Sequence, residues 1–195
     1  MTFQRACHKC RRNSGPILSG MPCSLVLAAP AATTYRLDRQ MSIISTTHLN
    51  LPGTARQALD FYQSVFGGTV TILTYGDFGA PQDTPGADKV VFGQIDNGSG
   101  FRLMAYDVPG RDTTDTSTVA GATRRENGTT ITDRTFFQSV RGQSLEEVTS
   151  IWNELADGAD IVEPLAASAW SPGFGMLTDR FGLTWVIDVE PRRHT

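Results

Sequence analysis

One pattern, a strand followed by a helix and three more strands, occurs twice in this chain of 195 residues. The first copy predicts strands at 43–51, 69–75, 89–95 and 101–106, with a helix at 54–66. The second predicts strands at 134–140, 159–162, 174–178 and 183–189, with a helix at 144–156. One such half would leave a sheet face open, so we expect both to form a single α+β domain of two pseudo-symmetric βαβββ modules.

Local signals mark both helices. Thr54 and Gln57 have the spacing of a capping box, and so do Ser144 and Glu147. The glycine pair at 67–68 is expected to end the first helix, because glycine tolerates the left-handed conformation that follows a C-cap. We expect module boundaries of 42–108 and 132–190, joined by a solvated crossing loop over 109–131 that is rich in Thr, Asp, Gly and Arg.

Charge and hydropathy exclude two classes of partner. The chain has 17 basic and 20 acidic residues, a net charge of −3, whereas a nucleic-acid binder would carry a basic stripe. It also lacks an uninterrupted run of about 18 apolar residues, which a membrane-spanning helix needs. We therefore expect neither nucleic acid nor a membrane as a partner.

Residues 1–40 differ from the rest of the chain. They hold all three cysteines, with six basic residues against one acidic residue. The segment 7–10 (CHKC) could be half of a zinc site, but a matching second half is missing. Residues 1–32 imitate a secretory signal, which would mean export. We prefer a third interpretation, a disordered leader outside the native fold, with a single domain over 41–195 in a cytoplasmic protein.

Several segments resemble a known family. The segments 47–51 (THLNL), 58–62 (ALDFY) and 65–68 (VFGG) resemble the opening of the vicinal-oxygen-chelate superfamily, the glyoxalase/bleomycin resistance/dioxygenase group. The segments 170–171 (WS) and 174–185 (FGMLTDRFGLTW) resemble the ending of its PhnB-like branch. The resemblance covers about residues 42 to 190. It implies a glyoxalase-like domain, commonly a homodimer, with a cavity between its modules.

Catalytic members of this superfamily hold a divalent metal with His and Glu side chains that point inward from strands. By this resemblance, His48 and Asn50 point inward from the first strand. In the fourth strand of the first half, Phe92 stands where many relatives have His, and Gln94 where a glutamate ligand would stand. With His48, the substitutions Phe92→His and Gln94→Glu are expected to supply three ligands.

The second half offers few further donors. The family's ligand positions fall near Thr135 or Phe137 in its first strand and near Val186 in its last, with Asp188 and Glu190 on the same face. Only His48 and Glu190 are candidate metal ligands, whereas a catalytic zinc site normally has three protein ligands. We therefore predict no metal or other cofactor, and a divalent metal is the disfavoured alternative.

Individual residues leave alternatives open. His48 is either a core histidine satisfied by one hydrogen bond or, with Asn50 and Gln94, part of a polar pocket wall, since unpaired polar groups are costly in a filled core. Trp170 either packs or covers the mouth of the cavity. Asp179 and the residue after it are expected to form a structural turn.

The resemblance and the ligand count together predict a small-molecule-binding protein without a competent metal site. We expect His48, Asn50, Phe92, Gln94 and Trp170 to contact the ligand, whose identity the sequence does not reveal. One alternative is a metal-dependent lyase, isomerase or dioxygenase of the same superfamily, and whether the chain is an enzyme stays open. Another is a structural dimer whose cavity is filled by side chains.

Overall fold

The computed structural model describes residues 43–113 and 122–190, which belong to one compact unit, Ile43–Thr195. The expectation of a disordered leader at 1–40 lies outside the described residues, as do both ends of the domain expected over 41–195. Within the described part, no helix is long and apolar enough to cross a membrane.

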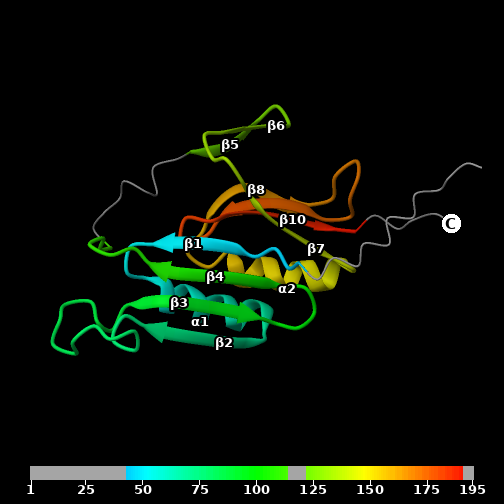
Figure 1. Ribbon diagram of the computed structural model, residues 1–195. Helices are drawn as coiled ribbons and strands as arrows, with labels where there is room; N and C mark the ends of the chain where they lie inside the picture. Colours follow the sequence, from blue (N-terminus) through cyan, green and yellow to red (C-terminus); the bar gives the residue numbers. More distant parts are fainter. Residues whose placement is uncertain (1–42, 114–121, 191–195) are drawn as a thin grey trace, which may run out of the picture. The chain divides into compact units, whose positions relative to one another are not determined.

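The predicted order of elements is confirmed in the first module (Figure 1). Its elements are β1 (Thr47–Leu51), α1 (Ala55–Phe66), β2 (Thr69–Thr74), β3 (Val90–Asp96) and β4 (Arg102–Asp107). The four strands form one sheet in the order β1-β4-β3-β2, in which β1 runs parallel to β4. Because β4 lies between β1 and β3, the third strand is two positions away from the first.

The second module repeats this topology. Its elements are β7 (Gln138–Gly142), α2 (Leu145–Leu155), β8 (Asp160–Ala166), β9 (Phe174–Thr178) and β10 (Thr184–Val189). The sheet order is β7-β10-β9-β8, and β7 runs parallel to β10. The two modules therefore have the same fold, and the expected α+β architecture of two βαβββ units is confirmed.

The link between the modules differs from the solvated loop expected over 109–131. It contains a hairpin formed by β5 (Thr123–Glu126) and β6 (Thr129–Thr132), which pair antiparallel. The tip has two residues in the left-handed region, Asn127 at φ 50° and Gly128 at φ 78°. Such a two-residue turn matches the twist of the flanking strands, which is why Asn-Gly favours it.

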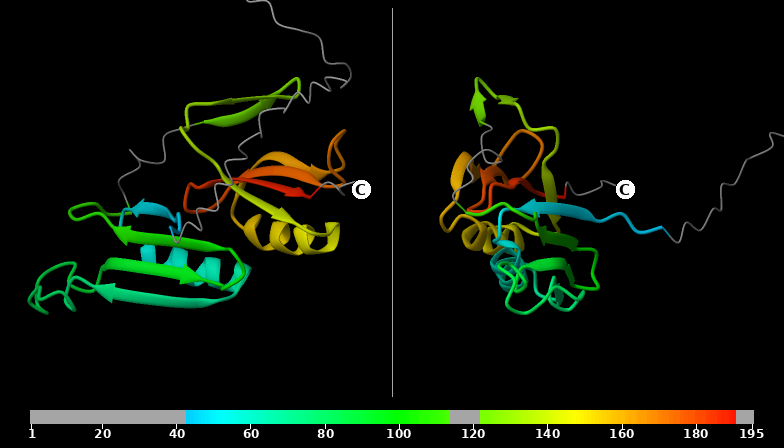
Figure 2. Two further views of the ribbon diagram at one scale, coloured as in Figure 1. Left: turned by 45° about the vertical axis from the view of Figure 1, so that its right-hand side comes forward. Right: turned by 60° about the vertical axis from the view of Figure 1, so that its left-hand side comes forward.

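One hydrophobic core joins both modules. The helices α1 and α2 contact each other, and each packs against its own sheet (Figure 2). Trp185 of β10 is fully buried and lies against two rings of α1, at 5.7 Å from Tyr62 and 5.4 Å from Phe66 between ring centroids. Since a residue of the second module completes the packing of the first helix, neither module is self-sufficient.

Candidate functional site: a cavity between the modules

The open face of the first sheet is opposite to α1. Along β1, Leu49 and Leu51 are buried toward the helix, whereas His48 and Asn50 are exposed on the other face. This alternation follows from the pleat of a strand, in which successive side chains point to opposite sides. The interpretation of His48 as a core histidine is therefore wrong, because the ring lies on the exposed face.

Two of the five residues that were expected to contact a small-molecule ligand, His48 and Asn50, line the same cavity. His48 and Asn50 border a cavity of about 380 Å³ together with residues from the segment before β7 and from the turn between β9 and β10. The other lining residues are Leu49, Leu51, Pro52, Asp133, Arg134, Thr135, Phe136, Phe181, Gly182, Leu183 and Thr184. Both modules contribute to its wall, so the cavity exists only in the paired arrangement.

The cavity wall combines apolar and polar groups. Phe136 is 55% exposed and Leu183 is buried, so an aromatic and an aliphatic surface are both available. Asn50 and Thr135 add neutral hydrogen-bonding groups, and Asp133 and Arg134 add one charge of each sign. Mixed walls of this kind, mostly apolar with a few polar groups, are typical of small-molecule sites.

The prediction that Phe92 and Gln94 occupy the fourth strand of the first half is wrong. They lie on β3, and neither lines the cavity. The residue opposite His48 on the adjacent strand is Met104 of β4, and Gln94 is in turn opposite Met104 on the far side. Neighbouring strands are about 4.8 Å apart, so the backbones of β1 and β3 are roughly 10 Å apart.

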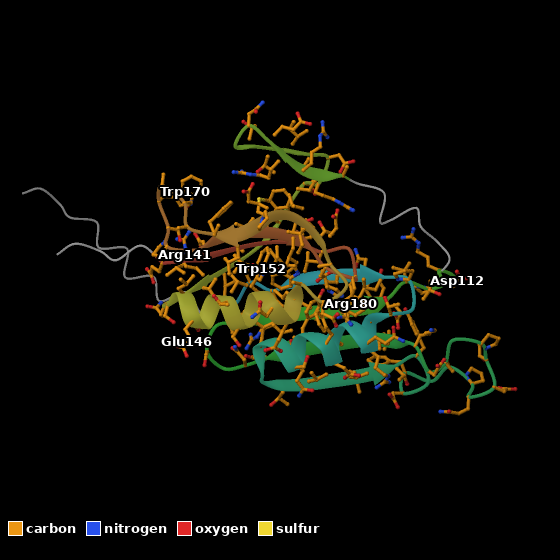
Figure 3. All side chains as sticks on the ribbon, turned by 180° about the vertical axis from the view of Figure 1, so that it is seen from behind. Asp112, Arg141, Glu146, Trp152, Trp170 and Arg180 are labelled. Atoms are coloured by element: carbon orange, nitrogen blue, oxygen red, sulfur yellow. The ribbon has the colours of Figure 1, made fainter. Side chains whose placement is uncertain are left out.

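Trp170 is separated from this cavity. It is 58% exposed in the segment between β8 and β9, and its only ring contact in the described residues is Phe174, at 5.3 Å between centroids. Figure 3 shows it toward one end of the second module, away from Arg180. Trp170 is not among the cavity-lining residues, so the structure does not bring it together with His48 and Asn50.

The matching face of the second sheet is covered by the β5–β6 hairpin. Arg125 Nε donates to Glu163 Oε2 of β8 at 3.0 Å, and the guanidinium lies 5.4 Å from the centroid of the Phe174 ring. Thr130 Oγ1 donates to Met176 Sδ at 3.7 Å. The two sheets therefore differ in exposure, because a segment of the chain itself covers the open face of the second one.

The residues present do not fit the metal site that the superfamily's catalytic members imply. Across residues 43–113 and 122–190, no three His, Cys, Asp or Glu side chains come together as potential ligands. The ring of His48 contacts Tyr106, at 5.3 Å between centroids. Glu190 accepts a hydrogen bond from Gln143 Nε2 at 2.9 Å. Asp188 accepts hydrogen bonds from Nε and Nη2 of Arg141, so both carboxylates already have partners.

The ligand positions expected in the second half are also corrected. The strand β7 begins at Gln138, so Thr135 and Phe137 precede it instead of pointing inward from it. Val186 on β10 lies opposite Ser139 on β7 and Met176 on β9, and the three side chains include neither an imidazole nor a carboxylate.

The motif ending in TDRFGLTW has a structural role. Asp179 is 4% exposed and accepts four hydrogen bonds, so the expected structural turn is confirmed. The next residue, Arg180, donates to the backbone oxygen of Asp157 at 3.0 Å through Nε and lies over the ring of Phe61. Both side chains therefore make contacts that hold the turn and its neighbours in place.

A second cavity of about 490 Å³ lies within the first module, lined by the segment between β2 and β3 and by the residues after β4. Its wall includes Tyr75, Lys89 and Val108. Tyr75 donates to the backbone oxygen of Asp107 at 2.8 Å, and Lys89 donates to that of Gly53 at 3.2 Å. Because these polar groups already bond to backbone, this cavity offers fewer groups to a ligand.

Comparison with known proteins shows which family the chain is similar to. Residues 48–187 match the model of the Glyoxalase/Bleomycin resistance protein/Dioxygenase superfamily. The structure is similar to protein PA1353 from Pseudomonas aeruginosa, with a TM-score of 0.59 and 29% identity, over 76% of this chain and 98% of that one.

A second solved structure shares the fold. It is a protein from Bacillus cereus described as a putative 3-demethylubiquinone-9 3-methyltransferase, PhnB protein. The match has a TM-score of 0.54 and 22% identity, over 77% of this chain and 100% of that one. No curated protein matches the chain in sequence. The resemblance to the superfamily is thus confirmed, and a PhnB protein is among the structures with this fold.

Proposed function

Because the chain belongs to the Glyoxalase/Bleomycin resistance protein/Dioxygenase superfamily, we propose that it binds a small molecule in the cavity between its two modules. The observation that supports this proposal most directly is the cavity of about 380 Å³ with His48 and Asn50 exposed on its wall. Cavities of roughly 300–1,000 Å³ with a few polar groups are the usual sites for small ligands.

The alternative of a structural dimer with a filled cavity has less support. It requires aromatic side chains, Phe92, Phe136 and Phe137 among them, to collapse into the space between the modules. Phe136 instead lines the cavity and is 55% exposed, and Phe92 lies on β3, away from it. Space therefore remains for an external molecule.

Binding without a metal is part of the proposal. The donors nearest His48 on the adjacent strand are a thioether and a phenol, at Met104 and Tyr106, and neutral groups of this kind hold Zn²⁺ or Fe²⁺ poorly. Elemental analysis of protein purified without added metal is expected to give substoichiometric Zn, Ni, Mn and Fe. One tightly held metal per subunit, lost in His48→Ala, would favour the metal-dependent enzyme instead.

A thermal-shift screen with a panel of amphipathic aromatic compounds and small organic anions tests the site. Asn50→Trp places a large ring in the cavity from an exposed position and is expected to abolish the shifts that the wild type shows. Asp60→Trp is the control, because Asp60 is an exposed position of α1, away from both the cavity lining and the open face of the first sheet. Compounds that shift both variants equally would contradict the proposed site.

We further propose a homodimer in the cytoplasm. The open face of the first sheet carries Leu73, which is 38% exposed, next to Phe92 on the neighbouring strand. A second copy of the chain would remove this apolar surface from water. Sedimentation equilibrium is expected to give twice the chain mass, and Leu73→Glu is expected to shift the protein toward monomer.

A further inference from the structure

Two Asn-Gly pairs occur in the chain, Asn97-Gly98 and Asn127-Gly128, each at the tip of a hairpin. Asparagine before glycine is the most reactive context for deamidation. The backbone nitrogen of the glycine attacks the side-chain carbonyl carbon of the asparagine, and no Cβ on glycine obstructs the approach. The reaction requires a mobile asparagine side chain and a glycine N–H that is not held elsewhere.

The first pair is held in place by its hairpin. Asn97 Oδ1 accepts hydrogen bonds from the N–H groups of Ser99 at 2.9 Å and Phe101 at 3.0 Å. Asn97 Nδ2 donates to the backbone oxygen of Phe66 at the end of α1, at 3.3 Å. Three hydrogen bonds therefore have to break before the side chain can turn toward its own backbone.

The attacking nitrogen of the first pair is also occupied. The Gly98 N–H donates to Asp96 Oδ1 at 2.9 Å. The hydrogen bond from Gly98 N, and to a smaller extent the hydrogen bond and charge of Arg102, lower the pKa of the Asp96 carboxyl. The acceptor is therefore ionised at neutral pH. Asn97-Gly98 is thus protected at both reacting groups.

The second pair has neither protection within the described residues. Asn127 is exposed, and no hydrogen bond involves its side chain or the N–H of Gly128. Glu126 pairs directly with Thr129, so the two residues between them form the whole turn. The reactive pair therefore lies at an exposed tip where only the turn itself limits its motion.

We propose that Asn127 is a site of spontaneous deamidation and that Asn97 is protected by its hydrogen bonds. Gly128 N bonds to Cγ of Asn127, the Cγ–Nδ2 bond breaks, and ammonia leaves with the proton from the amide. Water then opens the cyclic imide at either carbonyl, which gives aspartate or isoaspartate. The modification puts a negative charge on the hairpin that carries Arg125, whose guanidinium holds Glu163.

The full-length protein allows the two sites to be compared within one sample. Trypsin cleavage after Arg125 and Arg134 releases residues 126–134, and cleavage after Lys89 and Arg102 releases residues 90–102, so each peptide contains one Asn-Gly pair. After incubation in mildly alkaline buffer, mass spectrometry is expected to show deamidation at Asn127 at least about tenfold faster than at Asn97. Even one or two of the four hydrogen bonds that must break at Asn97-Gly98 slow a reaction by roughly this factor.

A comparable rate at Asn97, or a faster one, in the native protein would overturn the proposal. Incubation in concentrated urea is the control, since unfolding removes the protection and is expected to make the two rates similar. If the difference persisted in urea, the fold would not be its cause and the proposal would fail. Asp96→Ala releases the Gly98 N–H and is expected to raise the rate at Asn97 alone.

Discussion

The hydroxyl of Tyr62 on α1 donates a hydrogen bond of 2.7 Å to Asp179 Oδ2 in the turn between β9 and β10. Trp185 Nε1 donates to the same oxygen at 2.8 Å, and the N–H groups of Phe181 and Leu183 donate to Oδ1 at 2.9 and 3.0 Å. One buried carboxylate therefore fixes its own turn and joins the helix of the first module to the second module.

Removing the hydroxyl of Tyr62 is expected to destabilise the protein. Tyr62→Phe leaves the ring in the core but removes one donor from a buried carboxylate, and hydrogen bonds to charged groups contribute about 1.5–3 kcal/mol. Urea unfolding measures the loss. The control is Tyr75→Phe, whose hydroxyl bonds a backbone oxygen at a half-buried position, where we expect about 1 kcal/mol or less. Equal losses in the two variants would contradict this role.

Tyr62 is also expected to affect stability in alkaline solution. Burial, and then the charge and hydrogen bond of Asp179, raise the pKa of Tyr62 well above the ordinary 10.0. Above pH 10.0 the unfolded chain loses this proton while the folded protein keeps it, so stability falls as the pH rises from 10.0 toward the raised value. The unfolding free energy of Tyr62→Phe should decrease less steeply over this range than that of the wild type.

The two helices are capped differently, which predicts different mutational effects. Thr54 makes no side-chain cap, and the buried carboxylate of Asp107 instead accepts from Ala55 N at 2.8 Å and from Val90 N at 2.9 Å. Thr54→Ala is therefore expected to be nearly neutral, whereas Asp107→Ala leaves two buried donors unsatisfied and should cost about 3 kcal/mol. Thermal unfolding of both variants distinguishes them.

In the second helix, Ser144 is the expected N-cap, but the side chain of Glu147 bonds to the residue before Ser144 and does not close the capping box. Glu147 N donates to Ser144 Oγ at 3.2 Å, and Glu147 Oε2 accepts from Gln143 N at 2.8 Å. We expect Ser144→Ala to cost about 1 kcal/mol, the usual effect of removing an N-cap. A loss at Thr54→Ala as large as that at Ser144→Ala would contradict the assignment of Asp107 as the effective cap of α1.

The strand order changes the route to an engineered metal site. Phe92→His with Gln94→Glu is now expected to fail as a site with His48, because β4 separates β3 from β1. Met104 is directly opposite His48 on the adjacent strand, so Met104→His pairs two imidazoles on one face. Calorimetric titration with Ni²⁺ is expected to show tighter binding to Met104→His than to the double variant.

Local patterns in the sequence predicted the elements that local interactions stabilise. The helices, the N-cap of α2 and most strands follow from periodicity and turn residues that act within a few positions. The hairpin β5–β6 had a comparable signal, because the Asn-Gly pair at 127–128 is followed by two threonines and Ile131. The polar and charged composition of the segment favoured the prediction of a loop instead. The strand β8 continues past Pro164 because it lies at the sheet edge, where proline's missing N–H costs no ladder bond.

By itself the sequence thus determined the repeated βαβββ order and the resemblance to the superfamily, and it placed His48 and Asn50 on one face of the first strand. Only the tertiary structure decided which side chains meet. Asp107 rather than Thr54 caps α1. Phe92 and Gln94 lie apart from the cavity because the sheet places β4, and not β3, beside β1. Trp170 lies apart from it in the segment between β8 and β9. Helix caps and strand faces depend on neighbours in the chain, whereas a cavity depends on strand order and module pairing, which no local pattern encodes.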